Sequence, residues 1–351
     1  MRFEWGTIGR ELIVASCFFL PRQERIRLER WLRGWQENRQ IEAADFVVVS
    51  FPNSGRTWLH VLLLRYFQAQ RGFEDAHFAD LKALRDHDPA VPLIHFTHDN
   101  YLRDYSGEGP LKASYGRKKV VLLVRDPGDV AVSQFHQWQH RMRQRKKVIN
   151  DYPLDTRLSL FEFTLGRQGV LARVIRFLNE WAEALPQMPE VLLVRYEDLR
   201  ADTPATLAKI LAFWGEQAVP SRIQEAVDYA SLANMRALEQ QGGRLFRPGS
   251  FSLWKFLRRS GAKSESVLKA RRAKVGGYRG DFSEYEAALI DATIDRSLAP
   301  VFGYRRDAAS AVAGAAPSKA RMRAEMAATS AAAASASAAS AASDRAAGSG
   351  G

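Results

Sequence analysis

The sequence predicts an α/β fold in which helices flank a central parallel sheet. Three short runs of mainly Val and Leu, at 45–51, 119–125 and 190–196, read as strands. Uninterrupted apolar runs of this length are typical of strands that are buried on both faces, as in parallel sheets. Segments with helical spacing of apolar residues separate the runs, and they supply the crossovers that parallel strands require.

The helical segments follow the strands in order. Apolar residues recur at helical spacing in each of them, and one begins with Thr203-Pro204, which places proline at the first helical position. We therefore predict helices at 57–70, 128–145, 161–185, 203–214, 221–230 and 283–298.

The composition is that of a globular protein without a membrane span. The chain has 351 residues, of which 46% are hydrophobic and 26% charged, which excludes wholesale disorder. The apolar stretch 12–20 is shorter than the roughly 20 residues that a spanning helix needs, although a peripheral membrane contact stays open. Cys17 is the single cysteine, so we expect no intrachain disulfide and a cytoplasmic location.

Changes in composition divide the chain into three parts. Residues 1–43 read as a helical extension, and residues 44–306 hold the alternating strands and helices. From 307 to 351, 21 of 45 residues are Ala and 8 are Ser. Such a segment buries too little apolar surface to offset chain entropy, so we expect a disordered tail.

The net charge of +12 favours anionic partners but does not choose among nucleic acid, a membrane surface and phosphorylated or sulfated small molecules. The ends of the strands are more informative, because parallel sheets bind ligands outside the carboxyl ends of their strands.

The first such segment is 50–59, SFPNSGRTWL, between a strand and a helix. Gly55 permits close backbone approach, and the N-terminus of the helix offers unpaired N–H groups, as an anion cradle requires. The alternative to an anion-binding loop is an ordinary turn between the strand and the helix. A Walker A loop would have glycine in place of Ser50 and lysine in place of Arg56.

This loop resembles the [YF]PKSGTTW loop of sulfotransferases that use 3′-phosphoadenosine 5′-phosphosulfate (PAPS). Asn53 stands where the family has Lys, and Arg56 stands where it has Thr. The matching residues are Phe51, Pro52, Ser54, Gly55, Thr57 and Trp58.

Three further segments resemble the same family in the same order. The sequence RDPGDVAVS at 125–133 is similar to RxPxDVAVS, which implies that Arg125 and Ser133 bind the 3′-phosphate. Tyr196 begins a YEDL segment, which implies a tyrosine beside the adenine. The segment 271–278 is similar to RKGxxGDW, and it implies further phosphate contacts from Arg271, Arg272 and Ala273, where the alanine replaces a glycine.

The general base implied by the resemblance is His98, within a segment similar to KTHLP. Phe96 replaces the Lys of that pattern, and His95 is the reserve candidate. His136 and His140 have helical metal-ligand spacing, but no third ligand is evident, so we expect no metal.

Together these resemblances imply a P-loop-like three-layer sandwich that transfers a sulfuryl group from PAPS to a hydroxyl or amine. The loop 52–57 would hold the phosphosulfate, Trp58 and Tyr196 would contact adenine, and Arg56 would supply the charge that Asn53 lacks. The acceptor is a small molecule, lipid or carbohydrate; we expect no nucleic acid partner, and the oligomeric state is open. The alternatives are a non-catalytic PAPS-binding relative, a nucleotide kinase or NTPase with Thr57 on Mg²⁺ and Asp126 as an acid, and a nucleic-acid binder that uses the net charge of +12.

Overall fold

A computed structural model describes residues 7–73, 80–107, 112–155, 157–167, 169–240 and 275–305. Residues Met1–Arg305 form one compact unit. The predicted tail and the predicted phosphate ligands Arg271, Arg272 and Ala273 lie outside the described residues.

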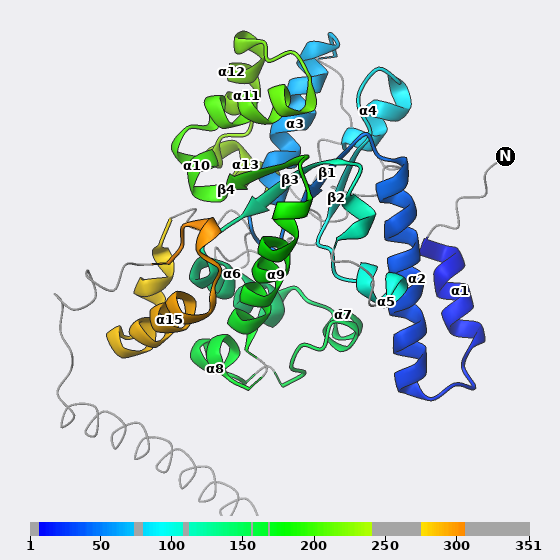
Figure 1. Ribbon diagram of the computed structural model, residues 1–351, viewed down its shortest axis with the longest axis vertical. Coiled ribbons are helices and arrows are strands. Elements are labelled where there is room, and N and C mark those ends of the chain that lie inside the picture. Colours follow the sequence, from blue (N-terminus) through cyan, green and yellow to red (C-terminus); the bar gives the residue numbers. More distant parts are fainter. Residues whose placement is uncertain are drawn as a thin grey trace, which may run out of the picture. The chain divides into compact units, whose positions relative to one another are not determined.

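The centre of the fold is a four-stranded parallel sheet with the order β2-β1-β3-β4 (Figure 1). The central strand β1 pairs with β2 on one side, Val47 opposite His95, and with β3 on the other, Val47 opposite Val120. The strands are β1 Phe46–Val49, β2 Ile94–Thr97, β3 Lys119–Val124 and β4 Val191–Arg195.

Two hydrophobic cores lie on the two faces of this sheet. Alternate residues of β3 divide between them: Val120 and Leu122 belong to the first core, and Val121 and Leu123 belong to the second. The first core is covered by α6 Pro127–His140, α8 Leu160–Leu165, α9 Val170–Ala184 and α15 Glu284–Ser297. The second is covered by α3 Arg56–Gln70, α4 Leu81–His87, α10 Tyr196–Ala201, α11 Thr203–Trp214, α12 Pro220–Tyr229 and α13 Leu232–Gln240. The predicted class, helices on both faces of a parallel sheet, is confirmed.

Local sequence signals set the helix starts. The Asp126 carboxylate accepts hydrogen bonds from the backbone N–H groups of Gly128 and Asp129, and Pro127 is at the first turn of α6. Ser283 and Glu286 form a capping box at the start of α15.

Two predicted helices are interrupted in the structure. The helix predicted at 161–185 breaks into α8 and α9, because the chain folds back so closely that a Cβ on Gly166 would lie 2.3 Å from a backbone oxygen, and one on Gly169 would lie 2.4 Å from another. The helix predicted at 128–145 ends at His140, and a short α7, Gln144–Ile149, follows.

The N-terminal residues form a hairpin of α1 Thr7–Ser16 and α2 Arg22–Ala43. Helix α2 packs on α5 Leu102–Ser106, and its Ile41 is fully buried in the first core. The domain boundary predicted at residue 43 stays a prediction. None of the helices in the described part of the chain is long and apolar enough to cross a membrane. The short 3-10 segments are η1 Ala113–Tyr115, η2 Leu185–Gln187, η5 Gly277–Asp281 and η6 Pro300–Phe302.

Candidate active site

The loop between β1 and α3 requires glycine at position 55 for two reasons. Gly55 is the N-cap of α3 and has a φ of 97°, in the region that favours glycine. A Cβ there would lie 2.5 Å from Cδ2 of Tyr196, which begins α10 after β4. The loop and the end of β4 are therefore in direct contact.

Asn53 is held by both its backbone and its side chain. Its φ of 69° is also left-handed, a conformation that asparagine tolerates better than most residues. Its side-chain amide donates to Oε1 of Gln134 on α6, and its carbonyl accepts from Nη1 of Arg125 at 3.0 Å. The side-chain amide of Asn53 is therefore already engaged in a hydrogen bond within the protein.

Arg125, directly after β3, joins the other predicted donor-site residues. Its guanidinium lies 4.6 Å from the ring centre of Tyr196 and 3.4 Å from the Ser133 hydroxyl. Trp58 meets Tyr196 edge-on with centroids 6.0 Å apart, and its indole N–H donates to the carbonyl of Ala230 at 2.9 Å. The structure thus brings Arg125, Ser133, Tyr196 and Trp58 together beside the loop.

Asp129 binds the segment that begins at residue 275 to this cluster. Its carboxylate accepts from the backbone N–H of Gly276 at 2.8 Å and of Tyr278 at 3.0 Å. It also lies 3.8 Å from Arg125. Arg271 precedes Gly276 by five residues, a length of chain that spans at most about 18 Å. Asp129 is part of the RDPGDVAVS motif, but the motif alone does not reveal this role.

Glu197 is a second residue whose role the motif did not reveal. It accepts from the backbone N–H of Asp126 at 3.0 Å and from the hydroxyl of Tyr304 at 2.6 Å. The acidic residue of YEDL therefore fastens the end of β3 to the chain after α15. Asp126 itself is the N-cap of α6, a structural use of the carboxylate that the kinase alternative needs as an acid.

His98 follows β2, at the neighbouring strand end. Its Nδ1 lies 2.8 Å from the carbonyl oxygen of Ser50, the first residue after β1. Because a carbonyl oxygen only accepts, this contact places the imidazole proton on Nδ1 and makes Nε2 the basic nitrogen. Pro92 has no backbone N–H to donate to the sheet, and β2 begins two residues later at Ile94. His95 and Phe96 therefore lie within the strand, and His98 is the first residue after it.

A buried network holds the turn that carries His98. The Asp99 backbone has a φ of 54°, and its N–H donates to the Thr97 hydroxyl at 2.9 Å. The Asp99 carboxylate lies 2.6 Å from Nζ of Lys112, and their side chains are 3% and 8% exposed. Lys112 also reaches Glu180 of α9 at 3.2 Å, and the Tyr115 hydroxyl donates to Asp99 at 3.1 Å. The turn is thus fixed from η1 and α9.

Glu37 of α2 reaches the same turn from the N-terminal hairpin. Its buried carboxylate accepts a hydrogen bond from the Thr97 hydroxyl. Burial raises the pKa of this carboxyl to about 7, although the Thr97 hydrogen bond and the charge of Arg56 act in the opposite direction. Glu37 was not predicted from the sequence, because a glutamate in a polar helix carries no signal of burial.

Arg56 begins α3, and its charge acts on Glu37 of α2 and on His95 of β2. Burial lowers its pKa to about 10, and the charge of Glu37 counteracts that effect. Burial, with the positive charge of Arg56, lowers the pKa of His95 to about 4. His95 is therefore neutral at physiological pH.

The arrangement fits a phosphorylated nucleotide. Gly55 has no side chain to cap α3, so the first N–H groups of that helix are available to an anion. The buried Ser50 hydroxyl has no hydrogen-bond partner among the described residues, and Arg125 adds a cation. No group of three potential metal ligands occurs within the described ranges.

Comparison with known proteins decides the family. The sulfotransferase domain matches residues 43–300. The chain belongs to the sulfotransferase family. This match confirms the family predicted from the loop and strand-end motifs.

Relatives of this sulfotransferase are distant in sequence. It is 23% identical to flavonol 3-sulfotransferase of Flaveria bidentis over 319 residues, which cover 81% of this chain and 94% of that protein. It is 24% identical to 3-alpha-hydroxysteroid sulfotransferase of Cavia porcellus, over 76% of this chain and 88% of the relative. A solved structure of mouse sulfotransferase SULT7A1 complexed with PAP is 19% identical, with a TM-score of 0.47 over 72% of this chain and 84% of that one.

We predict that Lys112→Met destabilises the sulfotransferase by about 3–5 kcal/mol in urea unfolding, because it leaves the buried Asp99 carboxylate unpaired. The double variant with Asp99→Asn should recover much of that loss. Lys82→Met is the control, because the Lys82–Asp86 pair is exposed and such pairs contribute little. Equal effects of the two lysine substitutions would contradict a buried ion pair.

We predict that Glu37 makes stability fall as pH rises from its ordinary value of 4.5 through about 7, because the folded state retains a proton that the unfolded state releases. Glu37→Gln mimics the protonated form, so the variant should gain on the wild type by on the order of 3 kcal/mol across this window, at about 1.4 kcal/mol per pKa unit. The measurement is the free energy of unfolding at both ends of the window. Glu42→Gln, an exposed glutamate on the same helix, is the control; equal pH profiles for both variants would refute the assignment.

Proposed function

We propose that this protein transfers a sulfuryl group from PAPS to the hydroxyl or amine of an acceptor and releases 3′,5′-ADP. The observation that carries the proposal is the pairing of Arg125 and Ser133 beside an uncapped helix start at the ends of β1 and β3. Two anion sites next to each other suit a nucleotide with phosphates on both the 3′ and 5′ oxygens. The family match supports the same reaction.

Each part of the donor site has its own task in this proposal. The loop residues Pro52 to Thr57, with the N–H groups that start α3, bind the 5′-phosphosulfate. Arg125 and Ser133 bind the 3′-phosphate, where a planar guanidinium suits a phosphate well. The rings of Trp58 and Tyr196 border the adenine. Arg271, Arg272 and Ala273 complete the phosphate site, and the hydrogen bonds of Asp129 to Gly276 and Tyr278 support this placement.

His98 is the general base of the proposal. Its Nε2 takes the proton of the acceptor as the acceptor oxygen or nitrogen attacks sulfur, and the bond from sulfur to the 5′-phosphate oxygen breaks. The carbonyl of Ser50, hydrogen-bonded to Nδ1, fixes the tautomer and stabilises the charged imidazolium. The loop donors stabilise the negative charge that develops on the departing phosphate oxygen.

Arg56 takes over the charge that Asn53 cannot supply. Asn53 is a neutral donor and its amide bonds to Gln134, whereas Arg56 is the cation of the loop. The negative charge of Glu37 interacts favourably with the positive charge of Arg56. Arg56 therefore has both the charge and the place in the loop for this task.

The acceptor is proposed as a small molecule, a lipid or a carbohydrate. Two relatives are named for a flavonol and a hydroxysteroid, so a phenol and a sterol alcohol are the first acceptors to test. The cytoplasmic location stays a prediction.

We predict that saturating 3′,5′-ADP raises the melting temperature by several degrees and that AMP raises it far less. A ligand at about 100 times its Kd stabilises by roughly 2.7 kcal/mol. Arg125→Ala should weaken 3′,5′-ADP roughly 10- to 100-fold and remove its advantage over AMP. Arg157→Ala, with 90% of its side chain exposed, is the control. Stabilisation only by ATP with Mg²⁺ would favour the kinase alternative.

We predict that His98→Ala lowers kcat on the order of 10²- to 10⁴-fold, the usual contribution of a general base, while the melting shift with 3′,5′-ADP is retained. The assay is transfer from PAPS to a phenol. His95→Ala is the matched control, and a larger loss for that variant would transfer the base to His95. Binding of 3′,5′-ADP without turnover of any acceptor tested would favour the non-catalytic relative.

We predict that Arg56→Ala lowers turnover on the order of 10²-fold or more, since it removes a donor that acts on the developing charge. Adding Asn53→Lys should restore part of the loss by putting a cation at the position where the family has lysine. Asn53→Lys alone should cost some stability, because it gives up the Gln134 hydrogen bond and an asparagine in a left-handed conformation. Full turnover by the Arg56→Ala protein would refute the role of Arg56.

A further inference from the structure

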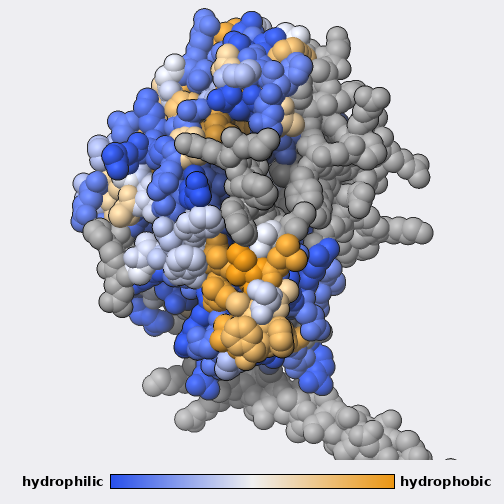
Figure 2. Space-filling model, turned by 90° about the vertical axis from the view of Figure 1, so that its right-hand side faces the viewer, coloured by the Kyte–Doolittle hydropathy of each residue, from blue (hydrophilic) through white to orange (hydrophobic). Residues whose placement is uncertain are grey.

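The tip of the N-terminal hairpin exposes large apolar side chains. Phe18 and Phe19, in the turn between α1 and α2, are 76% and 72% exposed, and Leu12 on α1 is 65% exposed. The two phenyl rings meet edge-on with centroids 6.0 Å apart. Figure 2 shows apolar surface gathered on the side of the molecule that carries the hairpin. We call Leu12, Phe18 and Phe19 the Phe tip. Isolated exposed apolar residues are common, whereas neighbouring ones mark an interaction site.

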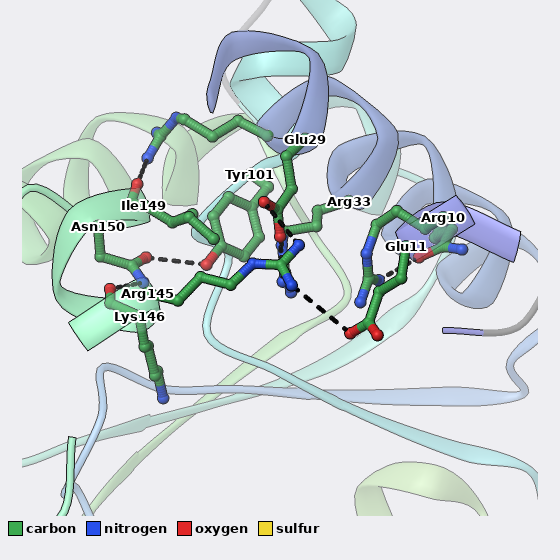
Figure 3. Close-up of polar contacts among 11 residues, drawn as sticks. Arg10, Glu11, Glu29, Arg33, Tyr101, Arg145, Lys146, Ile149 and Asn150 are labelled. Carbon is green, nitrogen blue, oxygen red and sulfur yellow. Dashed lines mark hydrogen bonds and ion pairs between the residues drawn. The ribbon is translucent and has the colours of Figure 1, made fainter. Parts of the chain in front are cut away.

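Polar contacts hold the hairpin on the rest of the unit (Figure 3). Arg10 of α1 donates to Gln36 of α2 at 2.6 Å. Arg145 of α7 lies 3.1 Å from Glu29 of α2 and 3.9 Å from Glu11 of α1. The Phe tip is therefore presented on a fixed base, and little conformational freedom is lost when it binds a partner.

The same hairpin is rich in arginine. Residues 9–33 contain six Arg and three Glu, and neither Lys nor Asp. Arg22 and Arg27 are exposed in the first turns of α2, where Arg27 also pairs with the exposed Glu24 at 2.7 Å, and Arg143 is exposed at the start of the adjacent α7. Two copies of the chain that met through this face would bring like charges together, whereas an anionic surface is complementary to it.

We propose that the Phe tip inserts into the apolar boundary of an anionic phospholipid bilayer while Arg22 and Arg27 contact the headgroup phosphates. Stable attachment to a membrane surface takes two signals, and the hairpin carries an apolar one and a basic one side by side. The chain would lie on the membrane and not span it. This inference does not depend on the reaction at the donor site.

The test is cosedimentation of the full chain with vesicles of phosphatidylcholine containing about 30% phosphatidylserine. We expect binding that Phe18→Ser with Phe19→Ser weakens about 10-fold or more, because the apolar contribution is lost. Val301→Ser, at a 51% exposed apolar residue in η6 outside the hairpin, is the control and should bind as the wild type does. Arg22→Ser with Arg27→Ser should weaken binding as well. So should NaCl raised from about 0.1 M to about 1 M, which shortens the Debye length from about 10 to 3 Å.

Circular dichroism and the melting shift with 3′,5′-ADP show whether the Phe tip variants remain folded. Equal vesicle binding by the wild type and the folded double-serine variant would overturn the proposal, as would no binding by the wild type at low salt. Analytical ultracentrifugation gives the third decisive outcome. A wild-type dimer that the double-serine substitution converts to a monomer would assign the Phe tip to a second copy of the chain and overturn the membrane contact.

Discussion

The guanidinium group of Arg125 is the contact on which the site geometry depends. It donates to the carbonyl of Asn53, lies over the ring of Tyr196 and approaches both Ser133 and Asp129. These four partners belong to the loop after β1, the start of α10 after β4, and α6. One side chain after β3 thus joins segments that are far apart in sequence.

A second constraint acts at the turn after β2, where charged side chains are buried and need partners. The turn bearing His98 is tied down by Asp99, Lys112 and Glu37, which all lie largely out of water. Burying an ion pair brings little net stability, but removing one partner is costly, so such a pair specifies one conformation of the turn. The N-terminal hairpin contributes to this constraint through Glu37, although it lies almost entirely before the residues that match the family.

The sequence was sufficient for three of the four strands, for most helices and for the strand-end motifs, because continuous apolar runs and turn residues are local signals. Strand β2, Ile94–Thr97, was missed because IHFT is not a continuous apolar run. The strand-end residues Arg125, Ser133, Tyr196 and Trp58 do lie together, as the carboxyl-edge rule for parallel sheets predicts. The break at Gly166 and Gly169 was missed, since helical periodicity continues across it and only close packing on α8 reveals it. Glu37, Lys112 and Glu197 were missed because their burial depends on distant segments that no local pattern encodes.

The departure of this loop from the family pattern has a conformational side as well as a chemical one. Position 53 has a left-handed backbone, where asparagine is under less strain than lysine, and the amide then finds Gln134 on α6. A neutral residue there removes a cation from the β3 side of the loop. Arg56, three residues later at the start of α3, is a cation whose charge interacts with that of Glu37. The charge of Arg56 thus acts on the protonation of Glu37 in α2 and of His95 in β2.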